Sequence, residues 1–461
     1  MKRVWLCRVV WGLTVLASIQ PGHCLAESTA PVSIVLGQSV IRLNSQWKFH
    51  IGDQTDWADP NFDDSSWETV NLTPAPGAHD DDVGLTGYVP GWEARGHRGY
   101  SGYAWYRLHA VVSAPTGASL SLAGPPAVDS AYQVFVNGTL LGGAGRFGHQ
   151  TPTVFSIQPH LFLIPAKLLD QGQPRSLVIA FRVWMGPWDL ADPAGGGIHI
   201  SPALGESNSI QMMYQMQWLE TVRGYVVEIV EAALFLLLAV MAVSLNAFEP
   251  VSRRYWWLAA ALVLTALYRT NQAVFFWWQF ETVHDFELVS IVLLIPLCLA
   301  CWTLAWRSWF RLRGATWTVG AVVVLTLFYM AAQFLARSWF YGIVPHSIVT
   351  TCHYLVNLIR ILFVLLTGVI VYRGIRQQGR EGWIALPAIV LVSIGQFAQE
   401  LSALGIQGIW FPFGTGVSRT QFAYAAFDVA LFILLLHQLR GYASPVRTNV
   451  TNSSHKRLSS L

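Results

Sequence analysis

Six charged residues interrupt long apolar stretches in the second half of the chain, and they have the clearest potential for chemistry. A charge inside an apolar helix is costly unless it has a partner, so such residues mark ion pairs, relays or binding sites. Arginine and carboxylate side chains can pair either to hold helices together or to form an element with two states. These candidates for an intramembrane polar relay are Glu228, Glu231, Arg269, Arg360, Glu400 and Asp428.

The elements that must position these charges are seven long apolar segments. The chain is 53% hydrophobic and only 12% charged, which is unusual for a soluble protein of 461 residues. Each segment is long enough to cross a hydrocarbon core of about 30 Å at about 1.5 Å per residue. The pattern predicts an all-α bundle of seven transmembrane helices over residues 224–439, with spans near 224–245, 255–278, 286–306, 315–336, 346–372, 383–404 and 418–439.

The distribution of basic residues predicts the orientation of this bundle. Twelve arginines and lysines follow the first, third, fifth and seventh segments, whereas the alternate joints hold only Arg337 and Arg419. Loops that remain in the cytoplasm carry the excess of positive charge. We therefore expect the N-terminal domain outside the cytoplasm and a short cytoplasmic tail over residues 440–461.

Depth along the predicted helices suggests which charges pair. Arg269 and the three glutamates fall in the outer third of their spans, while Arg360 and Asp428 fall near the middle. We expect Arg269 to pair with the glutamates and Arg360 to pair with Asp428, because a buried charge needs a partner at its own depth. These pairs serve either as glue between helices or as a switch that a docked domain biases.

Several catalytic chemistries lack their residues in the bundle. No lysine lies in residues 224–439, which excludes a retinal Schiff base there, and no Gly-x-Ser-Gly of an intramembrane serine protease is present. His346 and His353 share a helix face but have no third histidine at matching depth. Cys298 and Cys301 lie in an apolar helix, where packing is the better interpretation of C-x-x-C. We expect no enzyme and assign no catalytic residue.

The segment before the bundle begins with the features of a secretory signal. Residues 1–26 combine basic residues at the start, a short apolar run and a small residue at the expected cleavage site. Residues 27–205 then alternate short apolar and polar runs with Gly, Pro, Asn and Asp, which predicts an antiparallel sandwich. Residues 206–223, rich in Gln and Met, form a predicted connector to the membrane.

Residues in this predicted domain resemble a known family. The stretches Leu43 to Phe49, Phe62 to Trp67, Gly102 to Arg107, Val134 to Gly138 and Ile179 to Val183 are similar, in order and spacing, to the sugar-binding jelly-roll domain of family 2 glycoside hydrolases. The resemblance implies an all-β, galactose-binding-like jelly roll without the catalytic barrel of those enzymes. It also implies a structural role for Asp63, Asp64, Trp67, Trp105 and Arg107, whose side chains hold the sandwich together.

Two loops of this domain hold better candidates for ligand contacts. Residues 78–102 and 184–199 bring aromatic rings next to carboxylates and an arginine, a combination that suits sugar rings and hydroxyls or a ligand bridged by calcium. A solvated loop without a ligand is the alternative. No other cofactor is expected, and the candidates are Asp80, Asp81, Asp82, Trp92, Glu93, Arg95, His97, Trp188 and Asp189.

The order of the two predicted parts resembles the bacterial seven-transmembrane receptors with diverse intracellular signalling modules. That resemblance implies a sensor in the bacterial inner membrane that binds an extracytoplasmic, carbohydrate-like ligand and signals to a cytoplasmic effector protein. Residues 441–461 contain no recognisable effector, so we expect the effector to be separate or missing. A transporter or an envelope-assembly component with a carbohydrate-binding domain is the alternative. Membrane lipid is an expected partner and nucleic acid is not.

Overall fold

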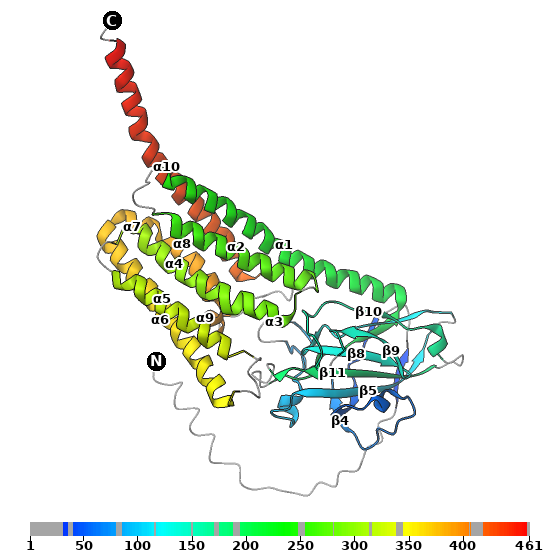
Figure 1. Cartoon of the computed structure of the whole chain (residues 1–461). Helices are drawn as coiled ribbons and strands as arrows, with labels where there is room; N and C mark the ends of the chain where they lie inside the picture. Colours follow the sequence, from blue (N-terminus) through cyan, green and yellow to red (C-terminus); the bar gives the residue numbers. More distant parts are fainter. Residues whose placement is uncertain are drawn as a thin grey trace. The chain divides into compact units, whose positions relative to one another are not determined.

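The computed structural model describes residues 31–35, 40–79, 85–114, 117–148, 151–169, 175–187, 194–247, 254–279, 281–312, 316–337, 344–404, 406 and 418–458. The predicted signal peptide lies outside these residues. Within the described part, a sheet-rich region comes first and a helical region follows it in the chain, the strands mostly blue to cyan and the helices green to red in Figure 1.

The larger sheet contains seven strands among the described residues. Its order is β4-β3-β5-β11-β8-β9, and β1 pairs in parallel with β5. The other pairings are antiparallel, with β5 and β11 in register over eleven residue pairs. The strands are β1 (Val32–Val35), β3 (Gln46–Ile51), β4 (Glu68–Asn71), β5 (Gly102–Ser113), β8 (Ala131–Val136), β9 (Thr139–Ala144) and β11 (Arg175–Met185).

A smaller sheet packs against one face of the larger one. Its order is β10-β6-β13-β2, and a separate pair joins β12 to β7. One buried cluster takes Trp47 and Phe181 from the larger sheet and Leu122 and Leu204 from the smaller one, so the core lies between them. The jelly-roll topology that the family resemblance implies for these two sheets stays a prediction. The strands are β2 (Val40–Arg42), β6 (Leu120–Ala123), β7 (Ala127–Val128), β10 (Leu161–Leu163), β12 (Ile198–Ile200) and β13 (Ala203–Glu206).

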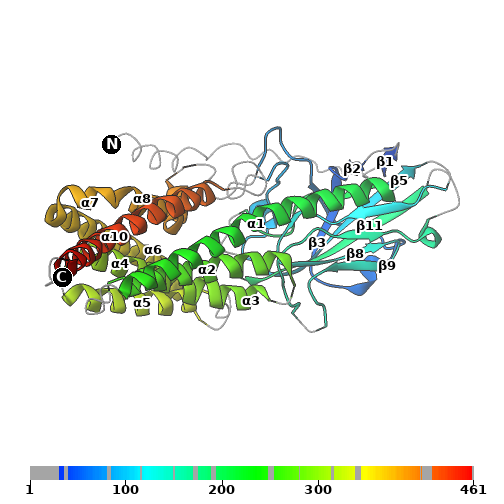
Figure 2. The same ribbon diagram turned by 90° about the horizontal axis from the view of Figure 1, so that it is seen from above.

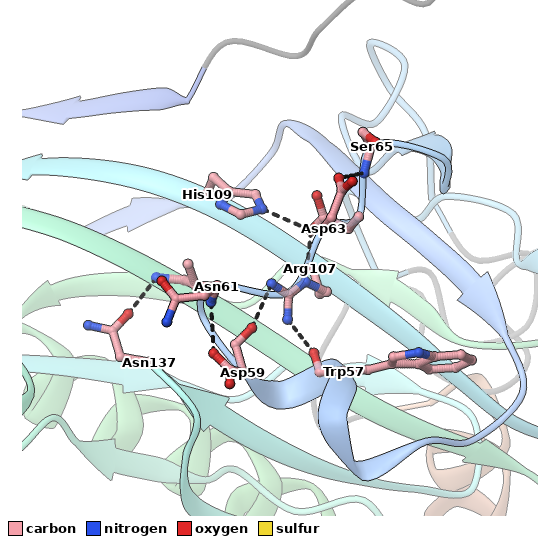
Figure 3. Close-up of polar contacts among 10 residues, drawn as sticks. Trp57, Asp59, Asn61, Asp63, Ser65, Arg107, His109 and Asn137 are labelled. Atoms are coloured by element: carbon pink, nitrogen blue, oxygen red, sulfur yellow. Dashed lines mark hydrogen bonds and ion pairs between the residues drawn. The ribbon is translucent and has the colours of Figure 1, made fainter.

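A fully buried arginine on β5 joins the turns at residues 57–64 to the face of the larger sheet that points away from the smaller sheet. The guanidinium of Arg107 donates from Nε to Asp64 Oδ2 (2.7 Å), from one terminal nitrogen to the carbonyl of Trp57, and from the other to the carbonyl of Asp59 (3.0 Å). His109 Nε2 lies 2.8 Å from the same Asp64 oxygen. Figure 3 shows these contacts converging from β5 and the preceding turns. They agree with the structural role expected for Asp64 and Arg107.

The same contacts lower the pKa of Asp64. Burial alone raises the pKa of this carboxyl, but hydrogen bonds and charge from His109 and Arg107 outweigh burial and hold its pKa below the ordinary 3.8. The stability contributed by the ionised form is therefore present above pH 3.8 and is lost as the pH falls through the lower folded pKa.

The helical region begins immediately after β13. Each of the seven predicted segments overlaps helical structure, but two are less regular than expected. The third contains a π-helix before α4, and the sixth is broken into three short helices. The elements are α1 (Ser207–Asn246), α2 (Trp256–Trp277), α3 (Val283–Phe286), the π-helix η5 (Glu287–Leu294), α4 (Ile295–Trp309), α5 (Thr316–Leu335), α6 (His346–Gln378), α7 (Arg380–Ile384), α8 (Leu386–Gln396), α9 (Ala398–Ala403) and α10 (Arg419–Leu458).

Several of these helices could span a membrane. Within the described residues, five are long and apolar enough: 207–246, 283–309, 317–335, 347–378 and 419–440. The apolar helix over 382–396 is shorter, and α2 carries Arg269, Asn271 and Gln272 close together, which lowers its hydropathy. The chain is thus compatible with a membrane protein, while seven crossings stay a prediction.

Helix α1 is longer than the predicted first span because it includes the predicted connector. Residues 207–223 are helical and continue without a break into the apolar part. At its start, Ile210 and Met213 pack against Ala123 of β6 and Ala203 of β13. Further along, α1 lies beside α2, as Figures 1 and 2 both show. One continuous helix therefore joins the smaller sheet to the helical core.

The packing order of the other helices determines which side chains can meet. Helix α10 packs on α1 and α8, whereas α6 packs on α5 and α4. Trp302 of α4 is buried in the middle, edge-on to Phe427 of α10 with 5.3 Å between ring centroids. Gly395 of α8 allows close approach to α10, since a Cβ there would lie 2.1 Å from the ring of Tyr424.

Replacing Asp64 with alanine should destabilise the sheet-rich region because it leaves the buried guanidinium of Arg107 without its carboxylate. We expect a loss of about 3 kcal/mol or more in the free energy of unfolding, measured by tryptophan fluorescence on the full chain at neutral pH. Asp63→Ala is the matched control, since this neighbouring carboxylate is exposed and its hydrogen bonds go to Ser65 and to no buried charge. Equal losses for both variants would contradict the assignment.

Candidate functional site

The centre of the candidate site is Arg269 of α2, which reaches two glutamates of α1. Glu228 and Glu231 lie three residues apart and so share a helix face. The Arg269 guanidinium is 3.0 Å from Glu228 Oε1, and its Nε donates to Glu231 Oε2 at 3.1 Å. All three residues are at most 5% exposed. This confirms the predicted pairing of Arg269 with the glutamates of the first segment.

Helix α10 completes this cluster with uncharged side chains. Gln421 Nε2 donates to Glu228 Oε1 (3.1 Å) and to the carbonyl of Gly224 (3.3 Å). The ring of Tyr424 lies under the Arg269 guanidinium, 5.0 Å from centroid to carbon. Sequence analysis missed both residues. A Gln and a Tyr three residues apart at the start of an apolar segment were the available signal, because such groups commonly complete a buried polar cluster.

The predicted pairing of Arg360 with Asp428 is wrong. Arg360 of α6 instead forms an ion pair with Glu400 of α9, with one terminal nitrogen 2.7 Å from Oε2. It also donates to the hydroxyl of Tyr329 (2.9 Å) and to the carbonyl of Gln396 (3.0 Å). We expected Glu400 in the Arg269 cluster, but it pairs with Arg360 instead.

The physical reason is that depth along a helix does not determine which helices are neighbours. Arg360 lies on α6, which packs on α4 and α5, whereas Asp428 lies on α10, which packs on α1 and α8. The sixth segment is also interrupted at Phe397, so the regular rise used to place Glu400 does not hold there. The long arginine side chain reaches the broken part of this segment.

Asp428 is left as an unusual buried carboxylate. It is 6% exposed, and neither carboxylate oxygen has a hydrogen-bond partner among the described residues. The six relay candidates together contain four carboxyl groups and two guanidinium groups. An uncompensated negative charge at this position is unfavourable. Asp428 is thus the one relay candidate that, within the described residues, takes part in neither the Arg269 nor the Arg360 ion pairs.

A small cavity is lined by residues of both arginine centres. It measures about 110 Å³, enough for a few water molecules. No group of His, Cys, Asp and Glu residues with metal-binding geometry occurs in the described part of the chain. The cavity can hold water or a small polar ligand, and its polar lining residues include Glu228, Arg269, Gln272, Arg360, Gln396 and Gln399.

Four of the predicted ligand residues make internal contacts in the sheet-rich region. Trp92 is 1% exposed, and its indole nitrogen donates to the carbonyl of Tyr100. Glu93 accepts from the amide of Gly99 (2.8 Å). Arg95 donates to the carbonyls of Pro90 and Asn71, and His97 Nε2 lies 2.6 Å from Glu68 Oε1. Their role in ligand binding stays a prediction.

The structure brings the two predicted ligand loops together. The amide of Gly91 donates to the carbonyl of Ala194 (2.6 Å), and the amide of Trp92 donates to that of Gly196 (3.0 Å). Gly91 must lack a side chain here, since a Cβ would lie 2.1 Å from the Gly196 oxygen. The remaining candidates, Asp80, Asp81, Asp82, Trp188 and Asp189, lie outside the described residues.

The sheet-rich region also contacts α2 directly, near the end of that helix. Ser156 Oγ donates to the carbonyl of Phe275 (2.7 Å), and Gln158 Nε2 donates to that of Phe276 (3.0 Å). The amide of Val283, at the start of α3, donates to the carbonyl of Val154 (3.0 Å). Carbonyls at the end of a helix lack intrahelical donors, so these contacts satisfy groups that need partners. Residues 154–158 therefore hold the end of α2.

Neutralising Glu400 and neutralising Asp428 should have opposite consequences. Glu400→Gln removes the charge that compensates Arg360 and should lower the free energy of unfolding by about 2 kcal/mol or more. Asp428→Asn replaces a buried carboxyl group that makes no hydrogen bond in the described part of the chain, and it should leave stability unchanged or higher. Unfolding of the full chain in detergent, followed by circular dichroism, measures both, and a larger loss for Asp428→Asn would contradict the observed pairing.

Comparisons with known proteins give a limited likeness. No family model and no curated protein matches the chain. Solved structures with a partial likeness include a Bacteroides uniformis beta-glucuronidase 2 (24% identity, 36% of this chain, 17% of that chain, TM-score 0.25). A Bacteroides vulgatus beta-glycosidase (19%, 36%, 20%, 0.23) and a Bifidobacterium dentium beta-glucuronidase (18%, 33%, 22%, 0.21) are also similar. The chain spans about a fifth of the length of these enzymes.

Proposed function

We propose that this chain is a membrane receptor whose sheet-rich region binds an extracytoplasmic, carbohydrate-like ligand and whose helices relay the binding to a cytoplasmic signalling protein. One observation supports this above the others. The loop over residues 154–158 holds the end of α2, and the same helix carries Arg269, the centre of the buried ion pairs. A ligand that moves this loop thereby acts on the helix that carries the cluster.

The ligand face in this proposal is the pair of loops that meet at Gly91 and Gly196. Loops on a sandwich are the usual place for binding residues because the sheets provide a rigid support. The resemblance of residues such as Phe62 to Trp67 to sugar-binding jelly-roll domains supports a carbohydrate-like ligand. The proposal includes calcium as a bridge through Asp80, Asp81 and Asp82, because carboxylates are ligands that this ion prefers.

In this proposal, α2 transmits a shift of its end to the buried ion pairs. Arg269 lies six residues before Phe275, less than two turns away, so a shift of the helix end reaches the guanidinium. Glu228, Glu231 and Tyr424 surround that guanidinium from two other helices. Small helix shifts of this kind can switch packed interfaces between discrete arrangements. The proposed output is a changed arrangement of α1, α2 and α10.

The proposed location is the bacterial inner membrane, with the sheet-rich region outside the cytoplasm. The excess of arginine in alternate joints supports this orientation. The effector in the proposal is a separate signalling protein that docks on the arginine-rich cytoplasmic joints. We further propose that the chain performs no catalysis itself.

A transporter is the second candidate, and one specific observation favours it. The helix of the sixth segment is broken at Phe397, beside the cavity that Arg269 and Arg360 line. Broken helices at polar cavities are common in transporters. An envelope-assembly role would use the same carbohydrate-binding face without passage. Uptake of a labelled glycan into proteoliposomes separates a transporter from a receptor.

The ligand class can be tested with a glycan array probed by the purified full chain, with and without calcium. The proposal predicts selective binding to a small group of glycans. Uniform absence of binding under both conditions would count against a carbohydrate receptor.

The relay can be tested with the same glycan on the Ser156→Ala/Gln158→Ala variant. Both substitutions remove donors to the end of α2 and leave the ligand loops intact, so glycan affinity should change little. The ligand-induced change in fluorescence of a probe on the cytoplasmic end of α10 should be lost. A variant with unchanged affinity and an unchanged probe response would contradict the proposed route. Ser33→Ala, which changes an exposed serine on β1, is the control.

A further inference from the structure

A second, larger cavity lies where α4 ends, α5 begins and the last turns of α6 pass. It measures about 560 Å³, within the range of roughly 300–1,000 Å³ that is common for small-molecule sites. None of the relay candidates lines it. The cavity therefore belongs to a different part of the helical region from the Arg269 cluster.

The charge of this cavity has one sign. Three arginines line it, Arg307 from α4 and Arg373 and Arg376 from α6, and no Asp or Glu occurs among the described lining residues. Such a concentration of guanidinium groups without carboxylates attracts anions. Guanidinium groups match phosphate oxygens in geometry because their fork of N–H donors binds two oxygens at once.

Close packing of two helices brings the three arginines together. Arg373 and Arg376 lie three residues apart on one face of α6. Between them, Gly374 packs against Phe310 so tightly that a Cβ would lie 2.2 Å from the ring. Phe310 directly follows the end of α4, so this contact places the arginines of α6 beside Arg307.

Most of the remaining lining residues are aliphatic or aromatic, with Thr318 and Gln377 as the polar exceptions. Leu312, Val369 and Ile370 contribute aliphatic surface, and Trp317 and Tyr372 are more than half exposed, at 57% and 59%. Trp and Tyr are enriched where membrane proteins cross the headgroup region. A ligand with a phosphate group next to an apolar part matches both kinds of wall.

We propose that this cavity, the arginine pocket, binds the phosphate group of an anionic phospholipid. Basic pockets between membrane helices are known to hold anionic headgroups, and the helix ends that form this pocket are those with the positive charge excess. A soluble phosphate compound shares the chemistry of the headgroup, so the test must separate the two sources. The assignment does not depend on the receptor role of the chain.

The test uses the purified full chain in nonionic detergent and native mass spectrometry. Phosphatidylglycerol, phosphatidylcholine and inorganic phosphate are titrated separately. Phosphatidylglycerol should bind more tightly than phosphatidylcholine. In the Arg373→Gln/Arg376→Gln variant, which changes two exposed arginines, its affinity should fall about tenfold or more.

Two further variants separate a pocket from a general surface charge. Val369→Trp keeps every arginine but narrows the pocket, and it should weaken phosphatidylglycerol binding as well. Arg380→Gln removes an exposed arginine nearby that does not line the pocket, and it should leave binding nearly unchanged. Unchanged helical content by circular dichroism verifies that each variant is folded.

The outcomes are distinct. Equal weakening by Arg380→Gln and by the double arginine variant would show diffuse attraction and overturn the pocket. Inorganic phosphate that binds with the same sensitivity, while phosphatidylglycerol does not, would overturn the lipid assignment and identify a soluble phosphate ligand. Phosphatidylglycerol binding that both pocket variants weaken, and that Arg380→Gln does not, would support the proposal.

Discussion

A buried arginine held by two glutamates is the constraint on which the helical region depends. Arg269 cannot remain among apolar helices without compensation, and Glu228 and Glu231 supply it from one face of α1. This requirement fixes how α1 and α2 align, and Gln421 and Tyr424 extend the cluster to α10. Because the cluster joins three helices, a displacement of one must be accommodated by the other two.

The sheet-rich region applies the same principle at Arg107. Its guanidinium is fully buried and is satisfied by Asp64 and two backbone carbonyls, so the turns around Trp57 are held on the sheet. Between the two regions, α1 continues from the smaller sheet and residues 154–158 hold the end of α2. The buried pairs stabilise each region, and through these two connections a movement of one region can reach the other.

The sequence was sufficient where a local pattern determines structure. The depth of Glu228 and Glu231 relative to that of Arg269 predicted that ion pair, and hydrophobicity located the helices. The sequence was insufficient where a contact depends on which helices are neighbours in space. Asp428 and Arg360 share a depth, but their helices do not pack together, so Glu400 takes the arginine. The contact of Ser156 with α2 joins residues more than a hundred positions apart, and no spacing rule predicts it.

A double-mutant cycle on Glu231 and Arg269 tests the central claim most directly. The free energy of unfolding of the full chain is measured for Glu231→Gln, for Arg269→Gln and for the double variant. If the buried ion pair joins α1 to α2, each single change costs about 3 kcal/mol or more, and the double variant loses less than their sum by about 2 kcal/mol. Losses that add within about 0.5 kcal/mol would contradict the account.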